Sequence, residues 1–393
     1  MKKLLMATAA TSLMAGAASA EEIKLGVLLG FTGPIESMAP AMGAGAELAI
    51  AEVSASGLLL GGTTVVPVRA DSTCIDSAAA TAAAERLITS DGVKGIVGAA
   101  CSGVTGAVLA NVAKPNGMVM ISPSATSPAL SDVEDDGLFF RTAPSDARQG
   151  AVMADILMEN GIKTVALTYT NNDYGKGLAS SFEGAFTDAG GTVTISAAHE
   201  DDKADYSAEV GALASAGGDL LVVAGYADRG GAGIVRAALD LGAFDTFHFP
   251  DGMVSDATTD KFGDEIDGST GQLPGTDSPG AEKYAELVGD AFDATAIFSA
   301  ESYDAAALIL LAMQAAGSTD PQVYKDKVMD VVNAPGEPIY PGELAKALEI
   351  LAAGGDVDYV GATAAEFIGG GESAGNYRVV KVEGGKFETI GYR

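Results

Sequence analysis

The feature that most constrains the fold of this chain is a repeated alternation of short, β-branched apolar runs with longer alanine-rich stretches. It begins with a predicted strand at 23–29, a helix at 41–56, a strand at 64–70 and a helix at 77–89. This alternation is typical of a parallel sheet that carries helices on both faces. The sequence therefore predicts the α/β class.

The same alternation starts again after residue 143. Four predicted strands of the second unit are separated by helices: 164–169, 192–195, 220–224 and 246–249. Three later helices are expected to pack on the first unit: 281–292, 302–316 and 321–332. Two final strands could close the second unit: 377–382 and 387–391. We predict two doubly wound parallel-sheet lobes, with a ligand cleft beyond the carboxyl ends of their strands.

Length and charge exclude several classes of protein. The chain has 393 residues, enough for about two or three domains that need no disulfide scaffold. It carries 23 Lys and Arg against 53 Asp and Glu, a formal net charge of -30. Nucleic-acid binding requires clustered cationic side chains that neutralise phosphates, so we expect no nucleic-acid partner.

The N-terminal segment predicts export. Lys2 and Lys3 precede an apolar run up to Met14, and small residues follow as far as Ala20. This order is typical of a secretory signal peptide, which we place at residues 1–20. The apolar run is far shorter than the ~20 residues that span a bilayer. We therefore expect a periplasmic mature protein.

The two cysteines, Cys74 and Cys101, are expected to pair, because an oxidising compartment favours a disulfide. Closing this loop of about 28 residues would stabilise the fold by roughly 3 kcal/mol. A metal site or a nucleophilic cysteine are the alternatives. The only histidines are His199, expected at the surface in an acidic stretch, and His248, expected in the core.

Two loops of the first unit offer groups to an anion. Ser102 follows a predicted strand and is expected to be the N-cap of a helix whose free amides could bind a carboxylate. In the segment 122–128, two prolines leave backbone amides and carbonyls without helix or sheet partners. Simple helix capping and an ordinary turn are the respective alternatives.

Three loops of the second unit carry further candidates. Tyr174 and Tyr226 each follow a predicted strand, where an aromatic ring offers apolar surface and a hydroxyl group. Packing between the lobes would explain both equally simply. Asp251 also follows a strand and could pair with an ammonium, although an Asp before Gly is common in turns.

Enzymatic motifs are missing from the sequence. It has no nucleophile elbow, no phosphate-binding Gly-Lys loop and no zinc motif, and Gly26, Gly30 and Gly33 do not match the dinucleotide fingerprint. We expect no catalytic residue, no cofactor and no metal. A secreted hydrolase is the alternative from another class, and it would need a base beside a nucleophile.

These loops together resemble the leucine/isoleucine/valine-binding protein family, the type I periplasmic solute-binding proteins of branched-chain amino acid ABC transporters. The resemblance covers nearly all of the mature chain and rests on these segments: Cys101-Ser102, Ile121-Ser122-Pro123-Ser124-Ala125-Thr126, Phe140-Arg141-Thr142, Asn172-Asp173-Tyr174-Gly175-Lys176-Gly177, Gly225-Tyr226, Ile339-Tyr340-Pro341-Gly342 and Asp358-Tyr359-Val360-Gly361. It implies two lobes joined by a three-segment hinge. Lobe 1 would comprise 21–143 plus 275–375, and lobe 2 would comprise 144–274 plus 376–393. The cysteine pair also matches the disulfide of this family.

The resemblance also implies roles for polar residues in binding an amino acid. Ser102 and Thr126 would hold the ligand α-carboxylate through hydroxyl and amide groups. Ser124 would offer a backbone carbonyl to the α-ammonium, and Asp251 would supply its counter-ion. Tyr226 would contribute its hydroxyl group.

The side-chain pocket departs from the family pattern. Tyr174 and Phe298 would line it, and Ala125 would also contact the ligand. Branched-chain binders place an aromatic residue in the first loop, where this chain has Met38, with Phe31 nearby. Since relatives also carry amides, urea, polyamines or aromatic acids, the side chain of the ligand stays open. The acidic residue together with the carboxylate-binding groups favours a zwitterion.

The resemblance implies a monomeric receptor that closes around an amino acid, branched-chain or otherwise aliphatic, and delivers it to an ABC permease with cytoplasmic ATPases. A receptor for an amide, urea or aromatic acid is the alternative within the family. A ligand-sensing module that is read by a receptor is another.

Overall fold

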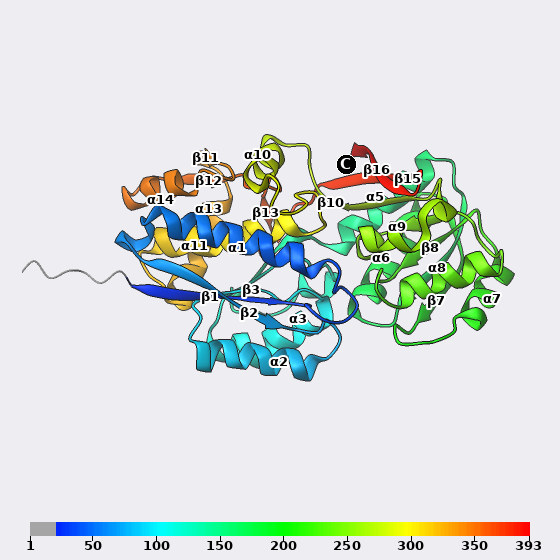
Figure 1. Cartoon of the computed structure of the whole chain (residues 1–393), viewed down its shortest axis with the longest axis horizontal. Helices are drawn as coiled ribbons and strands as arrows, with labels where there is room; N and C mark the ends of the chain where they lie inside the picture. The colour runs from blue at the N-terminus through cyan, green and yellow to red at the C-terminus, as the bar shows by residue number, and fades with distance from the viewer. Residues whose placement is uncertain (1–20) are drawn as a thin grey trace, which may run out of the picture.

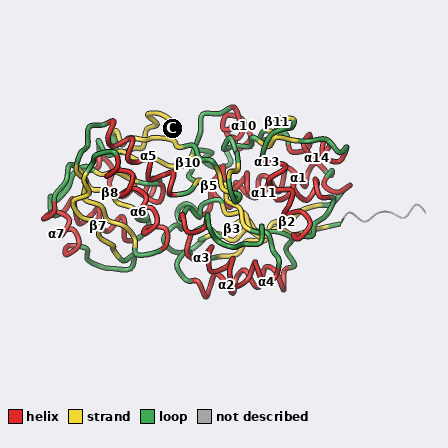
Figure 2. Tube along the Cα trace, turned by 180° about the vertical axis from the view of Figure 1, so that it is seen from behind, coloured by secondary structure: helices red, strands yellow, loops and turns green. Residues whose placement is uncertain are grey.

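The computed structural model describes residues 21–393 and contains two seven-stranded sheets, each at the centre of one lobe. The predicted signal peptide, residues 1–20, lies outside the described residues. Figure 1 shows the two lobes side by side along the long axis, and Figure 2 shows the same two sheets from behind with helices around them.

The first sheet has the order β13-β14-β5-β4-β3-β1-β2. Its strands are β1 (Glu22–Leu29), β2 (Thr64–Asp71), β3 (Ile96–Gly98), β4 (Met120–Ser122), β5 (Phe139–Pro144), β13 (Phe367–Ile368) and β14 (Glu372–Ser373). The helices of this lobe are α1 (Ala39–Ser56), α2 (Ser77–Arg86), α3 (Ser102–Val108), α4 (Lys114–Asn116), α10 (Pro279–Val288), α11 (Ser299–Ala316), α12 (Pro321–Tyr324), α13 (Val328–Val332) and α14 (Leu344–Ala352). A separate two-stranded sheet consists of β11 (Glu337–Ile339) and β12 (Val357–Tyr359).

The second sheet has the order β16-β15-β10-β9-β8-β6-β7. Its strands are β6 (Thr164–Thr170), β7 (Thr192–His199), β8 (Leu220–Ala224), β9 (Phe247–Phe249), β10 (Thr270–Pro274), β15 (Tyr377–Glu383) and β16 (Lys386–Tyr392). Its helices are α5 (Asp146–Glu159), α6 (Asp173–Asp188), α7 (Ser207–Ala216), α8 (Gly230–Asp240) and α9 (Asp256–Phe262).

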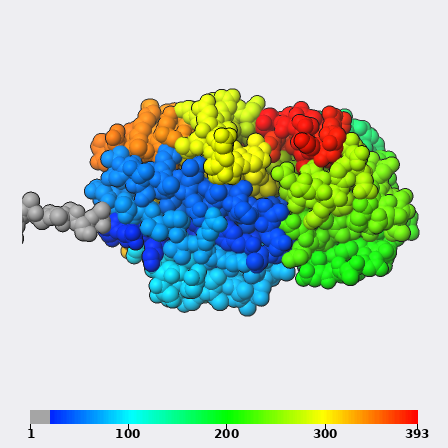
Figure 3. Space-filling model, viewed as in Figure 1, coloured from blue at the N-terminus to red at the C-terminus, as the bar shows by residue number. Residues whose placement is uncertain are grey.

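The predicted doubly wound α/β fold with two lobes is confirmed, although the sheets are mixed rather than purely parallel. The pairs β13–β14, β10–β15 and β15–β16 are antiparallel, and the other strand pairs of the two large sheets are parallel. The chain crosses between the lobes after β5, after β10 and between β14 and β15. In Figure 3 the C-terminal segment (red) accordingly lies on the green lobe, while the segment around α14 (orange) lies on the blue one.

Burial explains why these elements could be predicted from sequence. Every residue of the central strand β8 is buried, as its continuous apolar run predicts for a strand covered on both faces. The edge strand β7 alternates exposed and half-buried residues. Helix α11 is buried around nearly its whole circumference because α1, α13 and α14 pack against it.

A close contact between α1 and α11 requires a glycine. A Cβ atom on Gly45 would lie 2.1 Å from the carbonyl oxygen of Ser299, the first residue of α11. This approach holds the start of α11, and thus the preceding Phe298, against the first lobe.

The predicted disulfide between Cys74 and Cys101 is present, with a sequence separation of 27 residues. It joins the loop after β2 to the loop after β3. Within residues 21–393, no helix is long and apolar enough to cross a membrane.

Candidate functional site

A cavity lies between the lobes where loops from the carboxyl ends of both sheets meet. Its volume is only about 30 Å³, so the facing groups of the two lobes lie close together in this structure. The lining residues are Ile35, Met38, Met42, Ala100, Cys101, Ser102, Ser124, Tyr174, Tyr226, Asp251, Gly252 and Phe298. A hydrogen bond between the Ser37 amide and Asp228 Oδ2, at 2.9 Å, also joins the lobes.

The site residues predicted from sequence mostly converge on this cavity. Seven of the nine line it, while Ala125 and Thr126 do not. Both of these are buried and directly follow the lining residue Ser124. Ala125 and Thr126 would therefore contact a ligand in this cavity only if the loop moved or the lobes separated.

Ser102 faces the cavity as the first residue of α3. The predicted role of Ser102 as N-cap is wrong: the N-cap is Cys101, and the Ser102 Oγ accepts a hydrogen bond from the Ser127 amide at 3.1 Å. This contact fixes the hydroxyl oxygen and leaves its proton free to donate to an acceptor in the cavity.

The buried Arg141 side chain holds the proline-containing segment after β4 in place. The Arg141 guanidinium donates to the carbonyls of Ala125 and Ser127 at 3.0 and 2.9 Å, and it pairs with Glu372. The Ser122 Oγ accepts from the Ala125 amide at 3.0 Å. These contacts provide hydrogen-bond partners for backbone groups of this segment that have none in a helix or sheet, and they hold the loop at the edge of the cavity.

The second lobe contributes a buried carboxylate and two stacked tyrosines. Tyr174 Oη donates to Asp251 Oδ1 at 2.5 Å, and the Gly252 amide donates to the same carboxylate oxygen at 2.8 Å. The rings of Tyr174 and Tyr226 stack with centroids 5.3 Å apart. Asn172 donates to Tyr226 Oη at 3.2 Å, which orients the second hydroxyl. Burial raises the pKa of Asp251 above its ordinary value.

A second acid, Asp146, lies behind this group, and the sequence analysis missed it. Asp146 is fully buried at the start of α5, and its amide donates to the Thr126 carbonyl at 2.8 Å. Burial first, and then repulsion by Asp251, raise the pKa of Asp146 well above its usual range, while the nearby Thr126 side chain opposes this shift. Gln149, one turn later on α5, is equally buried, and its side chain lies near the Asp251 carboxylate.

An apolar wall completes the cavity on the side of the first lobe. Ile35, Met38, Met42 and Phe298 are all buried and line it. Phe298 takes a left-handed backbone conformation with φ 60° just before α11. Unbranched methionine side chains fill irregular spaces and adapt to different apolar shapes.

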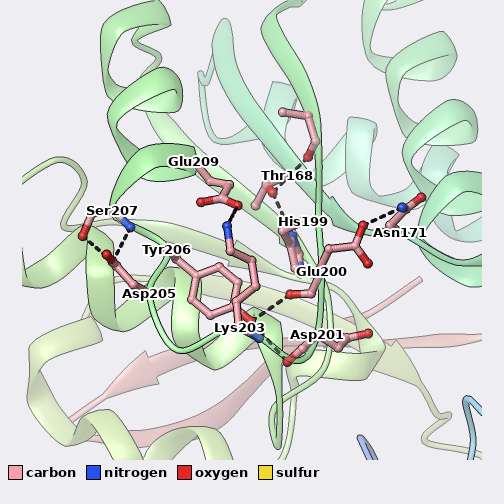
Figure 4. A network of polar contacts seen from close by, with 11 residues as sticks. Thr168, Asn171, His199, Glu200, Asp201, Lys203, Asp205, Tyr206, Ser207 and Glu209 are labelled. Carbon is pink, nitrogen blue, oxygen red and sulfur yellow. Dashed lines mark hydrogen bonds and ion pairs between the residues drawn. The ribbon is translucent and has the colours of Figure 1, made fainter.

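The two histidines do not belong to the cavity lining. His248 is buried in β9, as expected, but the prediction that His199 lies at the surface is wrong: it is 1% exposed, and burial lowers its pKa to about 4. The His199 Nδ1 lies 2.8 Å from Thr168 Oγ1. Figure 4 shows the surrounding polar network, in which Tyr206 Oη donates to the Glu200 carbonyl and Asn171 to the Glu200 carboxylate. This network ties the loop after β7 to the short loop between β6 and α6, the helix that carries Tyr174.

The chain matches a known family over most of its length. A family model described as "Periplasmic binding protein" covers residues 22–340. A leucine-, isoleucine-, valine-, threonine- and alanine-binding protein of Pseudomonas aeruginosa is 29% identical over 328 residues, which are 82% of this chain and 86% of that protein. Leu/Ile/Val-binding protein homolog 3 of Brucella melitensis is 31% identical over 319 residues, 80% of this chain and 84% of that protein.

The fold is similar to that of a solved protein structure. The crystal structure of a leucine-binding protein from Thermotoga maritima aligns with a TM-score of 0.78 and 24% sequence identity. The alignment covers 94% of this chain and 98% of that one.

Proposed function

The chain belongs to the periplasmic binding protein family, and we propose that it is the amino-acid receptor of an ABC importer. The Pseudomonas aeruginosa relative is named for binding leucine, isoleucine, valine, threonine and alanine, and the Thermotoga maritima protein is named for binding leucine. The observation that carries the proposal is the arrangement of the interlobe cavity. Hydroxyl groups from the first lobe, the Asp251 carboxylate from the second and an apolar wall meet there.

The polar groups suit a zwitterion. Ser102 and the neighbouring loop that contains Thr126 would bind the α-carboxylate, while the Ser124 carbonyl and Asp251 would bind the α-ammonium. Asp146 lies close enough to Asp251 for repulsion by Asp251 to raise the pKa of Asp146, and a bound ammonium would favour the ionised form of Asp146. Because an ammonium would offset part of this repulsion, the pair argues against a ligand that carries only a carboxylate.

The apolar wall suits an aliphatic side chain. Met38 and Met42 stand beside Phe298 and Ile35, with no polar side chain among these four. A pocket built with two methionines would accept several apolar side chains of different shape. We therefore propose leucine, isoleucine and valine as ligands, with methionine also accepted.

Closure of the lobes would couple binding to delivery. A ligand that contacts Ser102 and Asp251 at once stabilises the closed arrangement, because these residues lie on different lobes. An ABC permease with cytoplasmic ATPases would then take the ligand from the closed form in the periplasm. A monomer suffices for this role, since each chain carries both halves of the site.

The direct test is a thermal-shift screen of the mature protein against the twenty amino acids. A ligand at ~100 times its dissociation constant should add about 2.7 kcal/mol to the free energy of unfolding and raise the melting temperature. No shift with any amino acid would refute the proposal. Matched carboxylic acids and amides, included in the same screen, would identify the alternative ligand classes.

A further inference from the structure

A second and larger cavity, of about 320 Å³, lies where the chain crosses between the lobes. The end of β10, helix α10, the segment 294–298 and the start of α11 line most of it, and Arg378 of β15 lines the opposite side. Phe298 is the one residue that lines both this cavity and the central one. We call the larger one the hinge cavity.

Glu301 brings a buried negative group to the hinge cavity. It is 3% exposed, and its own backbone N–H is the only hydrogen-bond donor to its carboxylate among the described residues. Burial raises the pKa of Glu301 to about 7, and Asp304 adds to this by repulsion. A carboxylate in such a place is costly unless a proton or a cation accompanies it.

Arg378 brings the opposite charge to the same cavity. This half-buried side chain donates from Nη2 to the Thr295 carbonyl at 2.9 Å, and it forms no ion pair with any carboxylate in residues 21–393. Burial lowers the pKa of Arg378 from the ordinary value, and the nearby Asp293 and Glu301 carboxylates offset part of this shift. A guanidinium has five N–H donors and binds a carboxylate through two of them.

Glu301 and Arg378 therefore face one space and attract each other across it, although no hydrogen bond or ion pair joins them among the described residues. The exposed acids Asp277 and Glu282 also line the cavity, together with threonine and tyrosine side chains. The apolar part of the wall includes six alanines: Ala281, Ala285, Ala294, Ala296, Ala300 and Ala362. The volume lies at the lower end of the ~300–1,000 Å³ that small-molecule pockets span. A short molecule with a charge at each end would satisfy both groups and leave its methylene chain against the alanines.

We infer that the hinge cavity is a second binding site, for a short zwitterion whose carboxylate pairs with Arg378 and whose ammonium pairs with Glu301. Since Arg378 lies on the second sheet and Glu301 packs with the first lobe, the occupant would bridge the lobes. Through Phe298 it would also contact the wall of the central site, so the two sites would influence each other's affinity.

The test uses 4-aminobutyrate as the probe, titrated calorimetrically into the mature protein. Binding should occur in the native chain and in Asp251→Asn, which impairs the central site. It should weaken at least tenfold in Glu301→Gln and in Arg378→Gln. Butyrate and butylamine, each with one charge, should bind more weakly than the zwitterion. Glu286→Gln, an exposed change on α10, serves as the matched control and should bind the probe as the native chain does.

Two results would overturn the inference. One is no binding of 4-aminobutyrate at millimolar concentration. The other is binding that Asp251→Asn abolishes and Glu301→Gln leaves unchanged, which would assign the probe to the central site. Neither result bears on whether leucine binds in the central site, because the loss of leucine affinity in Asp251→Asn tests that site separately.

Discussion

Replacing Asp251 with asparagine tests how the central site recognises an ammonium. In the native chain, Tyr174 Oη donates to Asp251 Oδ1 at 2.5 Å. Asparagine keeps the shape of the side chain and an oxygen that can accept this hydrogen bond, but it removes the negative charge. Removing one partner of a buried, hydrogen-bonded charge pair costs about 2–5 kcal/mol. The lower part of this range applies, because Asp146 remains nearby and a bound ammonium would favour its ionised form. We expect leucine to bind roughly 30- to 150-fold more weakly, which corresponds to about 2–3 kcal/mol.

The comparison ligand is 4-methylpentanoate, which has the side chain and carboxylate of leucine but no ammonium. Its affinity should stay constant or improve in Asp251→Asn, because the native carboxylate repels it. Calorimetric titration of both ligands near neutral pH measures the difference, with Asp155→Asn, an exposed change on α5, as the control. Equal weakening of both ligands, or no weakening of leucine, would show that Asp251 does not bind the ammonium.

Three further predictions follow from packing and ionisation. Leucine affinity should fall as the pH drops and the Asp146–Asp251 pair gains protons. Asp146→Asn should move this fall to lower pH, because it removes the acid of the pair whose pKa is raised further. Gly45→Ala should lower the free energy of unfolding, measured in urea, by about 1–3 kcal/mol, because the added Cβ would overlap the Ser299 carbonyl oxygen. Gly184→Ala is the control and should not lower it, because Gly184 is exposed within α6 and has open space around it. Glu301 has a pKa of about 7 in the folded state, above the ordinary value of 4.5. Between pH 4.5 and about 7, the folded state therefore binds more protons than the unfolded state does. Stability should therefore fall by up to ~3 kcal/mol as the pH rises through this window, and Glu301→Gln should remove that slope.

Strong periodic patterns made much of the fold predictable. The run at 220–224 reads as a buried strand because all of its residues face the core. The short strands β13 and β14 gave no such signal, since glycines at 369, 370 and 371 separate them, β13 has only two apolar residues and β14 consists of Glu372 and Ser373. Such strands form because the rest of the first sheet presents an edge to them.

The candidate site was predictable where a functional group follows a strand. Tyr174, Tyr226 and Asp251 were found in this way, and all three line the central cavity. Asp146 was missed because it reads as an ordinary acid in the first turn of a helix. Its importance comes from full burial beside Asp251, a tertiary relationship that the local sequence does not contain.

The prediction that His199 lies at the surface was wrong because its neighbours in the sequence are acidic. The acids at 200, 201 and 202 indicate a solvated loop, yet the histidine itself ends β7 and faces inward. A hydrogen bond to Thr168 on the neighbouring strand satisfies one ring nitrogen, and burial keeps the ring neutral. Cross-strand partners of this kind become visible only when the register of the sheet is known.

The central claim is that an amino acid binds between the lobes as a zwitterion, and a crystal structure of the mature protein grown with leucine tests it most directly. We predict the α-carboxylate at Ser102 and the ammonium at Asp251. The side chain should lie against Met38, Met42 and Phe298. Leucine bound elsewhere, bound in the reverse orientation or not bound at all would contradict the account.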